Sequence, residues 1–461
     1  MIVMKFGGTS VGRPAHFGLA CDRIVRELVH DPVVIVSALA GVTNLLVEYC
    51  RDSERRPRLE QRFCEIHLEF ARAAELPRET IEPVLVAWRR TAQALGAPAA
   101  PLIGAERDDV LGFGERCAVE LLAGGLRARG VEAVAVHAGD AGLVTDERFG
   151  AAHPRPEADA RLRESLTQRP PLPVVTGFLG RTADGRPTTL GRGGSDYSAA
   201  LIGAALDAEE IQIWTDTSGM LSADPQVVPE ARPVPHLSFA EASELAYFGA
   251  KVLHPKTLVP AMDRGIPVRV LNTGRPDDPG SLITATAEAG PERWRVKSIA
   301  SKRGITAVTI SSTRMLLAHG FLAKVFEVFA RHHIVVDLVT TSEVSISLTV
   351  DDTARLEPAI AALAGIGQVD VRHGLAVIAV VGEEAPTNIG LAGHVFTLLG
   401  GVGIRVEMIS QGASRVNLSF VVRESEADAA VRVLHRGLGL DADMISTTVE
   451  RREPSAPRRM R

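Results

Sequence analysis

Short apolar runs alternate with amphipathic stretches along the first 290 residues. Runs such as Ile2–Phe6 and Val33–Ser37 are strand-sized, whereas Phe17–Val29 and Glu115–Ala128 carry apolar residues at the spacing of one helix face. Apolar strands that alternate with helices are typical of an α/β fold with a mostly parallel sheet covered on both faces. Residues 54–100 indicate a purely helical insertion. The remaining predicted strands are Val131–His137, Pro173–Gly177, Ile211–Thr215 and Val268–Leu271.

The C-terminal third of the chain repeats itself. Residues 320–350 align without a gap on residues 390–420, and each copy has a helix-period stretch followed by a period-2 stretch. Residues 272–295 are rich in proline, glycine and small side chains, so they mark the best domain boundary. We predict one domain over 1–290 and a second over 291–461, built from a duplicated βαββαβ unit. Because the sheets of such a unit cannot bury both faces alone, the copies should pack side by side and the chain should form a dimer.

Composition narrows the class of protein. The chain has 461 residues, of which 46% are hydrophobic and 23% charged, as in an ordinary globular protein. A net charge of -5 gives no support to nucleic-acid or membrane binding, and no apolar run approaches the roughly 18 residues needed to span a bilayer. Cys21, Cys50, Cys64 and Cys117 are too far apart for a zinc knuckle or a redox pair, so we expect reduced thiols. The N-terminus does not resemble a signal peptide, and we expect a cytoplasmic enzyme.

Lysine is scarce, with six residues among the 51 basic ones. A lysine at a strand end is therefore a candidate for a site that needs a compact positive charge. Lys5 ends the first predicted strand and is followed by Gly7-Gly8-Thr9-Ser10, a turn whose backbone N–H groups suit phosphate binding. A plain turn explains the same residues. The chain has no GxxxxGK[ST] motif, which argues against a P-loop.

Further polar residues follow the predicted strands. Arg192, in a second glycine cluster, offers a planar fork for a carboxylate, and Asp196 could anchor a lysine or cap the next helix. Glu115 could pair with a substrate ammonium or simply favour the helix dipole. Thr215-Asp216 ends another predicted strand, and Lys251 lies in a further glycine-containing segment.

Six motifs in order resemble aspartate kinases of the amino acid kinase family: KFGGTSV, VSALAGVTNLL, GFGE, TLGRGGSDYSAALIGAAL, WTD and FGAKVLHP. The repeat resembles the paired ACT domains of that family. The resemblance implies a three-layer αβα catalytic domain followed by two ferredoxin-like ACT units. The first unit would cover about 312–377, and the second about 296–311 plus 378–450, so that the strand near 296–310 belongs to the second unit.

The resemblance also implies the reaction and its residues. The γ-phosphoryl group of ATP would pass to the β-carboxylate of L-aspartate, the first step towards lysine, threonine and methionine, with Mg²⁺ bridging the phosphates rather than held in a protein cage. Lys5 would stabilise the transferring group, and Asp196 would orient the catalytic groups. Arg192 would hold the substrate α-carboxylate and Glu115 its ammonium. The other implied substrate residues are Ser37, Thr43 and Ser195, and the implied ATP residues are Lys5, Gly7, Gly8, Ser10, Thr215, Asp216 and Lys251.

Two residues depart from the family pattern. Leu221 stands where a tyrosine is usual in the nucleotide loop, and Gln226 where an arginine is usual. Losing a charged hydrogen bond to phosphate costs about 1.5–3 kcal/mol, or roughly 10- to 150-fold in affinity. We therefore predict weakened ATP binding with the chemical machinery intact.

The first ACT copy is most similar to the lysine-inhibited, single-function members of the family. There Asp337 and Glu343 could receive a cationic amino acid and Ser342 a carboxylate, although a capped turn explains Thr341 and Ser342 nearly as well. Ala318 replaces a residue that is usually polar, which leaves the effector's identity open. The implied effector residues are Met315, Gly320, Phe321, Leu322, Asp337, Thr341, Ser342 and Glu343.

Two other functions remain open at this stage. A non-catalytic amino-acid sensor would keep the fold without useful ATP turnover, and a related kinase would act on glutamate or a nucleotide. The expected partners are ATP, L-aspartate and an amino-acid effector, with lysine favoured, in a homodimer or dimer of dimers through the ACT units.

Overall fold

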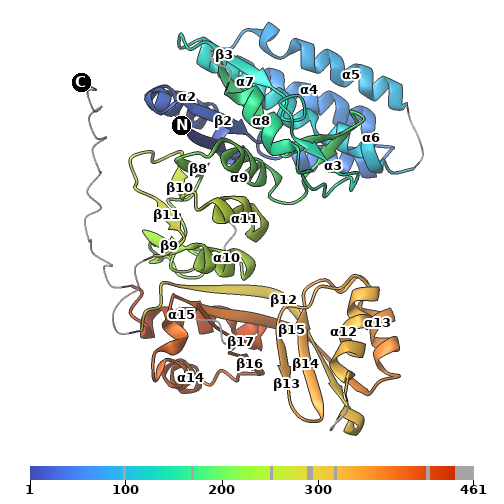
Figure 1. Cartoon of the computed structure of the whole chain (residues 1–461), viewed down its shortest axis with the longest axis vertical. Coiled ribbons are helices and arrows are strands. Elements are labelled where there is room, and N and C mark those ends of the chain that lie inside the picture. The colour runs from blue at the N-terminus through green and yellow to red at the C-terminus, as the bar shows by residue number, and fades with distance from the viewer. Residues whose placement is uncertain are drawn as a thin grey trace.

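The computed structural model describes residues 1–96, 100–167, 171–249, 253–287, 294–315, 319–411 and 416–441. Figure 1 shows an α/β domain with its helices at one end and an antiparallel sheet with its own helices at the other. Within the described ranges, no helix is both long and apolar enough to cross a membrane. All four cysteines are free and buried.

The α/β domain is built on one central sheet. In the described part of the chain this sheet has eight strands, and it is parallel except where β10 meets β11. The strands in spatial order are β3 (Ala133–Val136), β5 (Leu172–Thr176), β2 (Pro32–Val36), β1 (Ile2–Phe6), β8 (Glu210–Thr215), β10 (Val268–Asn272), β11 (Ser281–Thr284) and β9 (His236–Ser238). The predicted mostly parallel sheet is confirmed.

Helices cover both faces of this sheet because its strands are apolar on both sides. Ile2 and Met4 pack towards one face, and Val3 packs towards the other. The first face carries α1 (Gly8–Val11), α2 (Pro14–Glu27), α3 (Val42–Arg51), α4 (Arg56–Ala73), α5 (Glu82–Leu95), α6 (Gly104–Leu111) and α7 (Phe113–Arg127). The second carries α8 (Ala158–Leu166), α9 (Gly194–Leu206), α10 (Phe239–Tyr247) and α11 (Pro255–Arg264). The predicted helical insertion is confirmed as α4 and α5.

The α/β domain also contains a small separate sheet. It contains β4 (Val144–Thr145), β6 (Leu179–Thr182) and β7 (Pro187–Thr189). Short 3₁₀ turns occur at Leu28–His30, Arg78–Thr80, Thr313–Met315, Ala385–Thr387 and Glu424–Glu426.

The C-terminal region forms one antiparallel sheet that serves both repeats. Among the described residues it has six strands in the order β13 (Val339–Thr341), β14 (Ser345–Val350), β12 (Ser298–Ser311), β15 (Gln368–Val381), β17 (Asn417–Arg423) and β16 (Met408–Ser410). Its helices are α12 (Phe321–Arg331), α13 (Leu356–Leu363), α14 (Leu391–Gly401) and α15 (Ala427–Gly437). Helices α12 and α14 begin 70 residues apart, as the sequence repeat predicts.

Strand β12 does not belong to one unit alone. Residues 298–302 pair with the end of β15, beside the core of the second unit, and residues 306–311 pair with β14 of the first. The sequence placed 296–311 with the second unit, and half of the strand follows that expectation. Periodicity identifies a strand, whereas its pairing partners depend on tertiary structure.

Candidate active site

A lysine–aspartate pair lies at the carboxyl edge of the parallel sheet. Lys5 is on the same face of β1 as Val3, the face that α9 covers, and Asp196 is in the first turn of α9. The Lys5 Nζ is 2.5 Å from the Asp196 Oδ1, and the two side chains are only 9% and 14% exposed. The Lys5 ammonium and the N-terminus of α9 both place positive charge at this strand end, which suits an anionic ligand.

Asp196 therefore serves the ion pair and does not cap its helix. Helix α9 begins at Gly194 with Gly193 as its cap residue, three positions earlier than the capping interpretation requires. That alternative is wrong. Arg192 is exposed in the same turn, and Ser195 packs against Gly177 beyond the end of β5.

The glycine turn after β1 packs tightly against its neighbours. The Gly7 amide donates to the Trp214 carbonyl at the end of β8, 3.0 Å away. A Cβ on Gly8 would lie 2.7 Å from the Ala38 carbonyl oxygen, so the close approach of the two loops requires glycine there. The buried Ser10 hydroxyl donates to the Trp214 carbonyl and accepts from Thr273. Ser10 thus holds the turn in place, and its contact with phosphate stays a prediction.

Glu115 is a buried carboxyl group with one free oxygen. It lies in the first turn of α7, is 3% exposed, and its Oε1 accepts from the Ala38 amide at 3.2 Å. Its Oε2 has no hydrogen-bond partner within the described residues. Burial raises the pKa of Glu115 to about 8. Ala38 follows Ser37, and Thr43 lies in the first turn of α3, so this part of the predicted substrate set gathers in one loop.

A cavity of about 360 Å³ lies beyond the end of β8. Thr215 and Asp216 line it, as do Leu221 and Gln226, the two departures from the family pattern. Leu221 is half-buried and Gln226 is exposed. The structure thus brings these four predicted nucleotide residues together, while Lys251 lies outside the described residues.

Residues from the C-terminal region form another wall of this cavity. They are Ser298, Ile299, Ala300 and Ser301 of β12, together with Val431 of α15. The Ser298 hydroxyl donates to the Leu221 carbonyl at 2.7 Å, and the Ile299 amide donates to the Ser222 carbonyl at 2.9 Å. Sequence reasoning missed this wall because the residues of β12 that line the cavity form no motif.

The predicted effector residues occupy different environments. Phe321 is in the core of the first unit, Met315 packs against that core, and Gly320 and Leu322 are exposed. Thr341, Ser342 and Glu343 are exposed at the β13–β14 turn, where the Ser342 and Ser345 hydroxyls are 2.7 Å apart. The Asp337 side chain is 1% exposed and already paired. The exposed turn and the buried Asp337 carboxylate therefore do not form one open site.

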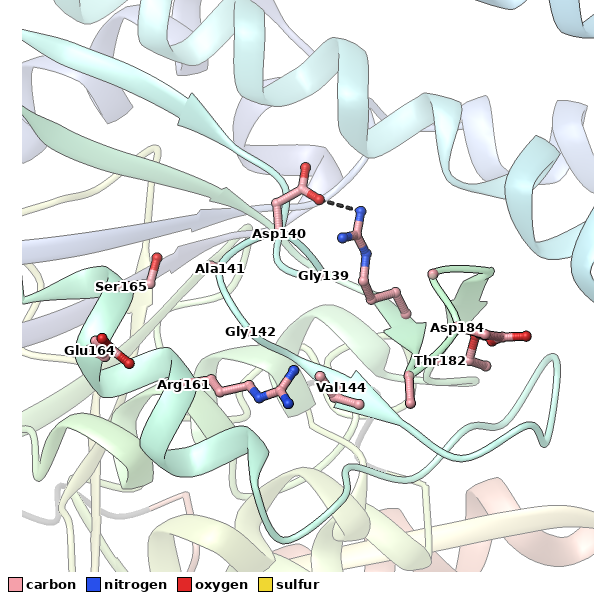
Figure 2. A pocket seen from close by; sticks show the side chains of 13 residues that line it. Gly139, Asp140, Ala141, Gly142, Val144, Arg161, Glu164, Ser165, Thr182 and Asp184 are labelled. Atoms are coloured by element: carbon pink, nitrogen blue, oxygen red, sulfur yellow. Dashed lines mark hydrogen bonds and ion pairs between the residues drawn. The ribbon is translucent and has the colours of Figure 1, made fainter.

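A second cavity of about 650 Å³ lies beside α8 and the small sheet. Figure 2 shows Arg161, Glu164 and Ser165 on one side and Asp140, which pairs with Arg181, on another. None of the residues predicted from the motifs is among those that line it. Its charged groups belong to a surface separate from the Lys5–Asp196 pair.

An open α/β sheet with a lysine, a glycine turn and a helix N-terminus at its carboxyl edge defines a class of nucleotide-binding proteins. Residues 1–272 match the model of the amino acid kinase family. Residues 308–365 and 378–438 match an ACT domain model.

Full-length relatives agree with these matches. Lysine-sensitive aspartokinase 3 of Escherichia coli is 38% identical over 95% of this chain and 99% of its own, and chloroplastic aspartokinase 1 of Arabidopsis thaliana is 37% identical over 98% and 82%. The crystal structure of E. coli aspartokinase III with aspartate and ADP (R-state) matches with a TM-score of 0.82 at 36% identity, covering 95% of this chain and 99% of that one. Its complex with lysine and aspartate (T-state), at the same identity and coverage, scores 0.75. The chain belongs to the aspartokinases of the amino acid kinase family.

Proposed function

We propose that this enzyme transfers the γ-phosphoryl group of ATP to the β-carboxylate of L-aspartate, giving 4-phospho-L-aspartate. The observation that carries the proposal is the buried Lys5–Asp196 pair at the carboxyl edge of the sheet, in a chain whose full-length relatives are aspartokinases. The protein takes little part in the covalent chemistry of such a transfer. Its contribution to catalysis is mainly to position the reactants and to neutralise charge.

The site residues divide into two groups by their chemistry. The Lys5 ammonium would contact the phosphoryl group during its transfer, and Asp196 holds that ammonium in position. Glu115 would receive the substrate ammonium on its unpartnered oxygen, and Arg192 would bind the α-carboxylate. An ammonium beside Glu115 favours the carboxylate form and lowers its raised pKa, so aspartate binding near neutral pH should release a proton.

Mg²⁺ would enter this site with ATP. The cavity beyond β8 offers oxygen donors of the kind that Mg²⁺ prefers, the carboxylates of Asp216 and Asp224 and the hydroxyl of Thr215. When bound, the ion supplies charge neutralisation on the phosphates. The residues of this chain would orient the nucleotide so that the γ-phosphate faces Lys5.

Feedback inhibition by lysine is the regulation that we propose. The E. coli relative is named as lysine-sensitive, and a solved structure of that enzyme contains lysine. The two ACT units, which share strand β12, would bind the effector and form a homodimer. Exposed apolar side chains on the first unit support such an interface: Leu322, Phe326, Val335 and Val344.

Hydroxylamine trapping tests the reaction. Incubation with ATP, Mg²⁺ and hydroxylamine should give a hydroxamate with L-aspartate and much less with L-glutamate. A Lys5→Met variant, checked for folding by circular dichroism, should lose about 10²- to 10³-fold in turnover, because it removes a charge that stabilises the transition state. Equal hydroxamate from glutamate, or full activity in Lys5→Met, would refute the proposal.

A further inference from the structure

Asp337 is paired on both of its carboxylate oxygens by groups from two other elements. The Tyr247 hydroxyl donates to its Oδ1. The Lys302 Nζ lies 3.3 Å from Oδ1 and 3.4 Å from Oδ2, and 4.4 Å from the Tyr247 ring centroid. Lys302 also pairs with Asp351, 2.8 Å away. The cluster of Tyr247, Lys302, Asp337 and Asp351 thus joins α10 of the catalytic domain to the first ACT unit.

A cation from solution cannot reach this carboxylate while the cluster is intact. The Asp337 side chain is 1% exposed, and the Lys302 side chain above it is 18% exposed. Burial raises the pKa of Asp337, while the neighbouring Tyr247 hydroxyl and Lys302 ammonium favour its charged form. A lysine side chain is already bound at the position predicted to receive the ammonium of a cationic effector.

Two elements, α10 and β12, connect the cluster to the cavity beyond β8, which we call the nucleotide cavity because ATP is expected there. Leu245, two residues before Tyr247 on α10, lines that cavity, and so does Ser301, immediately before Lys302 on β12. The segment just after α10 packs closely on β12, because a Cβ on Gly249, two residues beyond the helix, would lie 2.4 Å from the Ser301 carbonyl oxygen. Movement of Lys302 or Tyr247 would therefore move a wall of the cavity.

Strand β12 has an irregular register directly after Lys302. Its pairing with β15 shifts between Lys302 and Ile305, the stretch where the strand passes from the second unit to the first. Such bulges re-aim side chains and interrupt pairing, so Lys302 is not fixed by a continuous ladder on both sides. Asp351, which is 42% exposed, offers Lys302 a partner after it leaves Asp337.

We propose that Lys302 is a built-in competitor for the cationic effector: the effector's side-chain ammonium displaces it from Asp337, and Tyr247 transmits the change to the nucleotide cavity. This inference rests on the proposed lysine-regulated kinase. Because the internal ammonium competes for Asp337, it lowers the apparent affinity for the effector and so raises the effector concentration needed for inhibition. The Tyr247–Asp337 hydrogen bond is the direct contact through which the first ACT unit would act on α10.

Calorimetric titration of the full chain with L-lysine tests the competition. Lys302→Met removes the competitor and leaves the Asp337 carboxylate with Tyr247 and the like-charged Asp351 but no cation, so lysine should bind about three- to tenfold more tightly. Lys302→Arg keeps a cation and should stay within about twofold of the parent chain. If Lys302→Met folds poorly, Lys302→Gln takes its place, because glutamine keeps a polar side chain. It should show the same tighter binding of lysine. Unchanged or weaker lysine binding in the neutral variants would overturn the proposal.

Inhibition of turnover tests the role of Tyr247. A Tyr247→Phe variant keeps the ring over Lys302 and loses the hydroxyl that contacts Asp337. It should still bind lysine, while saturating lysine should inhibit its aspartate-dependent turnover less completely than in the parent chain. Full inhibition in Tyr247→Phe would contradict the transmission step. A parent chain without aspartate-dependent turnover would instead refute the proposed function, because the lysine affinities are measured independently of activity.

Discussion

Glu115 shows how burial prepares one side chain for a cationic ligand. Its carboxyl accepts from the Ala38 amide, and burial is the largest cause of its raised pKa. In the unliganded enzyme near neutral pH, much of Glu115 is therefore protonated. We propose that a substrate ammonium supplies the charge that this environment lacks, so that Glu115 acts in ground-state binding.

Replacing Glu115 by glutamine should raise the KM for aspartate and change kcat little. The amide keeps the size of the side chain and loses the charge that would meet the ammonium, at a cost of about 1.5–3 kcal/mol, or roughly 10- to 150-fold. Steady-state kinetics with varied aspartate gives both constants. A large fall in kcat at unchanged KM would show that Glu115 acts in the transition state.

The same carboxyl should make unfolding depend on pH. The folded pKa, about 8, is raised from the ordinary value of 4.5, so between these pH values the folded state keeps a proton that the unfolded state loses. Stability should therefore fall as pH rises through this window, by at most about 1.4 kcal/mol per pH unit. Denaturant titrations of the parent chain and Glu115→Gln should diverge between pH 5 and 8. Parallel curves would contradict the raised pKa.

The nucleotide loop carries the two residues at which the sequence departs from the family pattern. Both Leu221 and Gln226 line the cavity beyond β8, so the two departures lie where ATP is expected. The double variant Leu221→Tyr/Gln226→Arg should lower the ATP KM by about 10- to 150-fold while the aspartate KM stays unchanged. An ATP KM in the parent chain as low as that of the variant would mean that other groups compensate.

Helix α10 is one of the elements that join the two domains. Its Ser238 cap and Glu241 form a capping box, and Glu241 also binds Lys297 at 2.8 Å and the Glu383 amide. Glu244 bonds Asn417 of β17, and Tyr247 bonds Asp337. One helix thus contacts both ACT units through side chains along its length.

The buried Glu241–Lys297 pair should be sensitive to the loss of one partner. The side chains are 0% and 4% exposed, so Glu241→Gln leaves a buried ammonium without its counter-charge and should cost about 3–5 kcal/mol of unfolding free energy. Glu327→Gln is a matched control, since its pair with Arg331 is about two-thirds exposed and should contribute less than about 1 kcal/mol. Similar effects of both substitutions in denaturant titrations would contradict this account.

Local patterns predicted the elements better than the contacts between them. The apolar run Ile2–Phe6 gives β1 at the same bounds, and the 70-residue repeat gives α12 and α14. The double role of β12 and the pairing of Lys302 with Asp337 were not predictable, because a lone lysine in a strand shows no partner. Asp337 was predicted as an effector residue from family resemblance, and only the fold reveals that its own chain occupies it.

At the scale of the whole molecule, the catalytic domain and the ACT units share strand β12. One half of strand β12 lines the cavity beyond β8, where we propose that the nucleotide binds, and the other half pairs with the first ACT unit. An effector that alters the first unit can therefore act on nucleotide binding over a short path. The homodimer and the cytoplasmic location remain predictions, and light scattering of the purified chain would test the former.

Aspartate-dependent ATP turnover titrated with lysine tests the central claim most directly. We predict that ADP forms only when aspartate is present and that its rate falls as lysine rises, while threonine and methionine have little effect. Turnover without aspartate, or a rate that none of the three amino acids changes, would contradict the account of a feedback-regulated aspartate kinase.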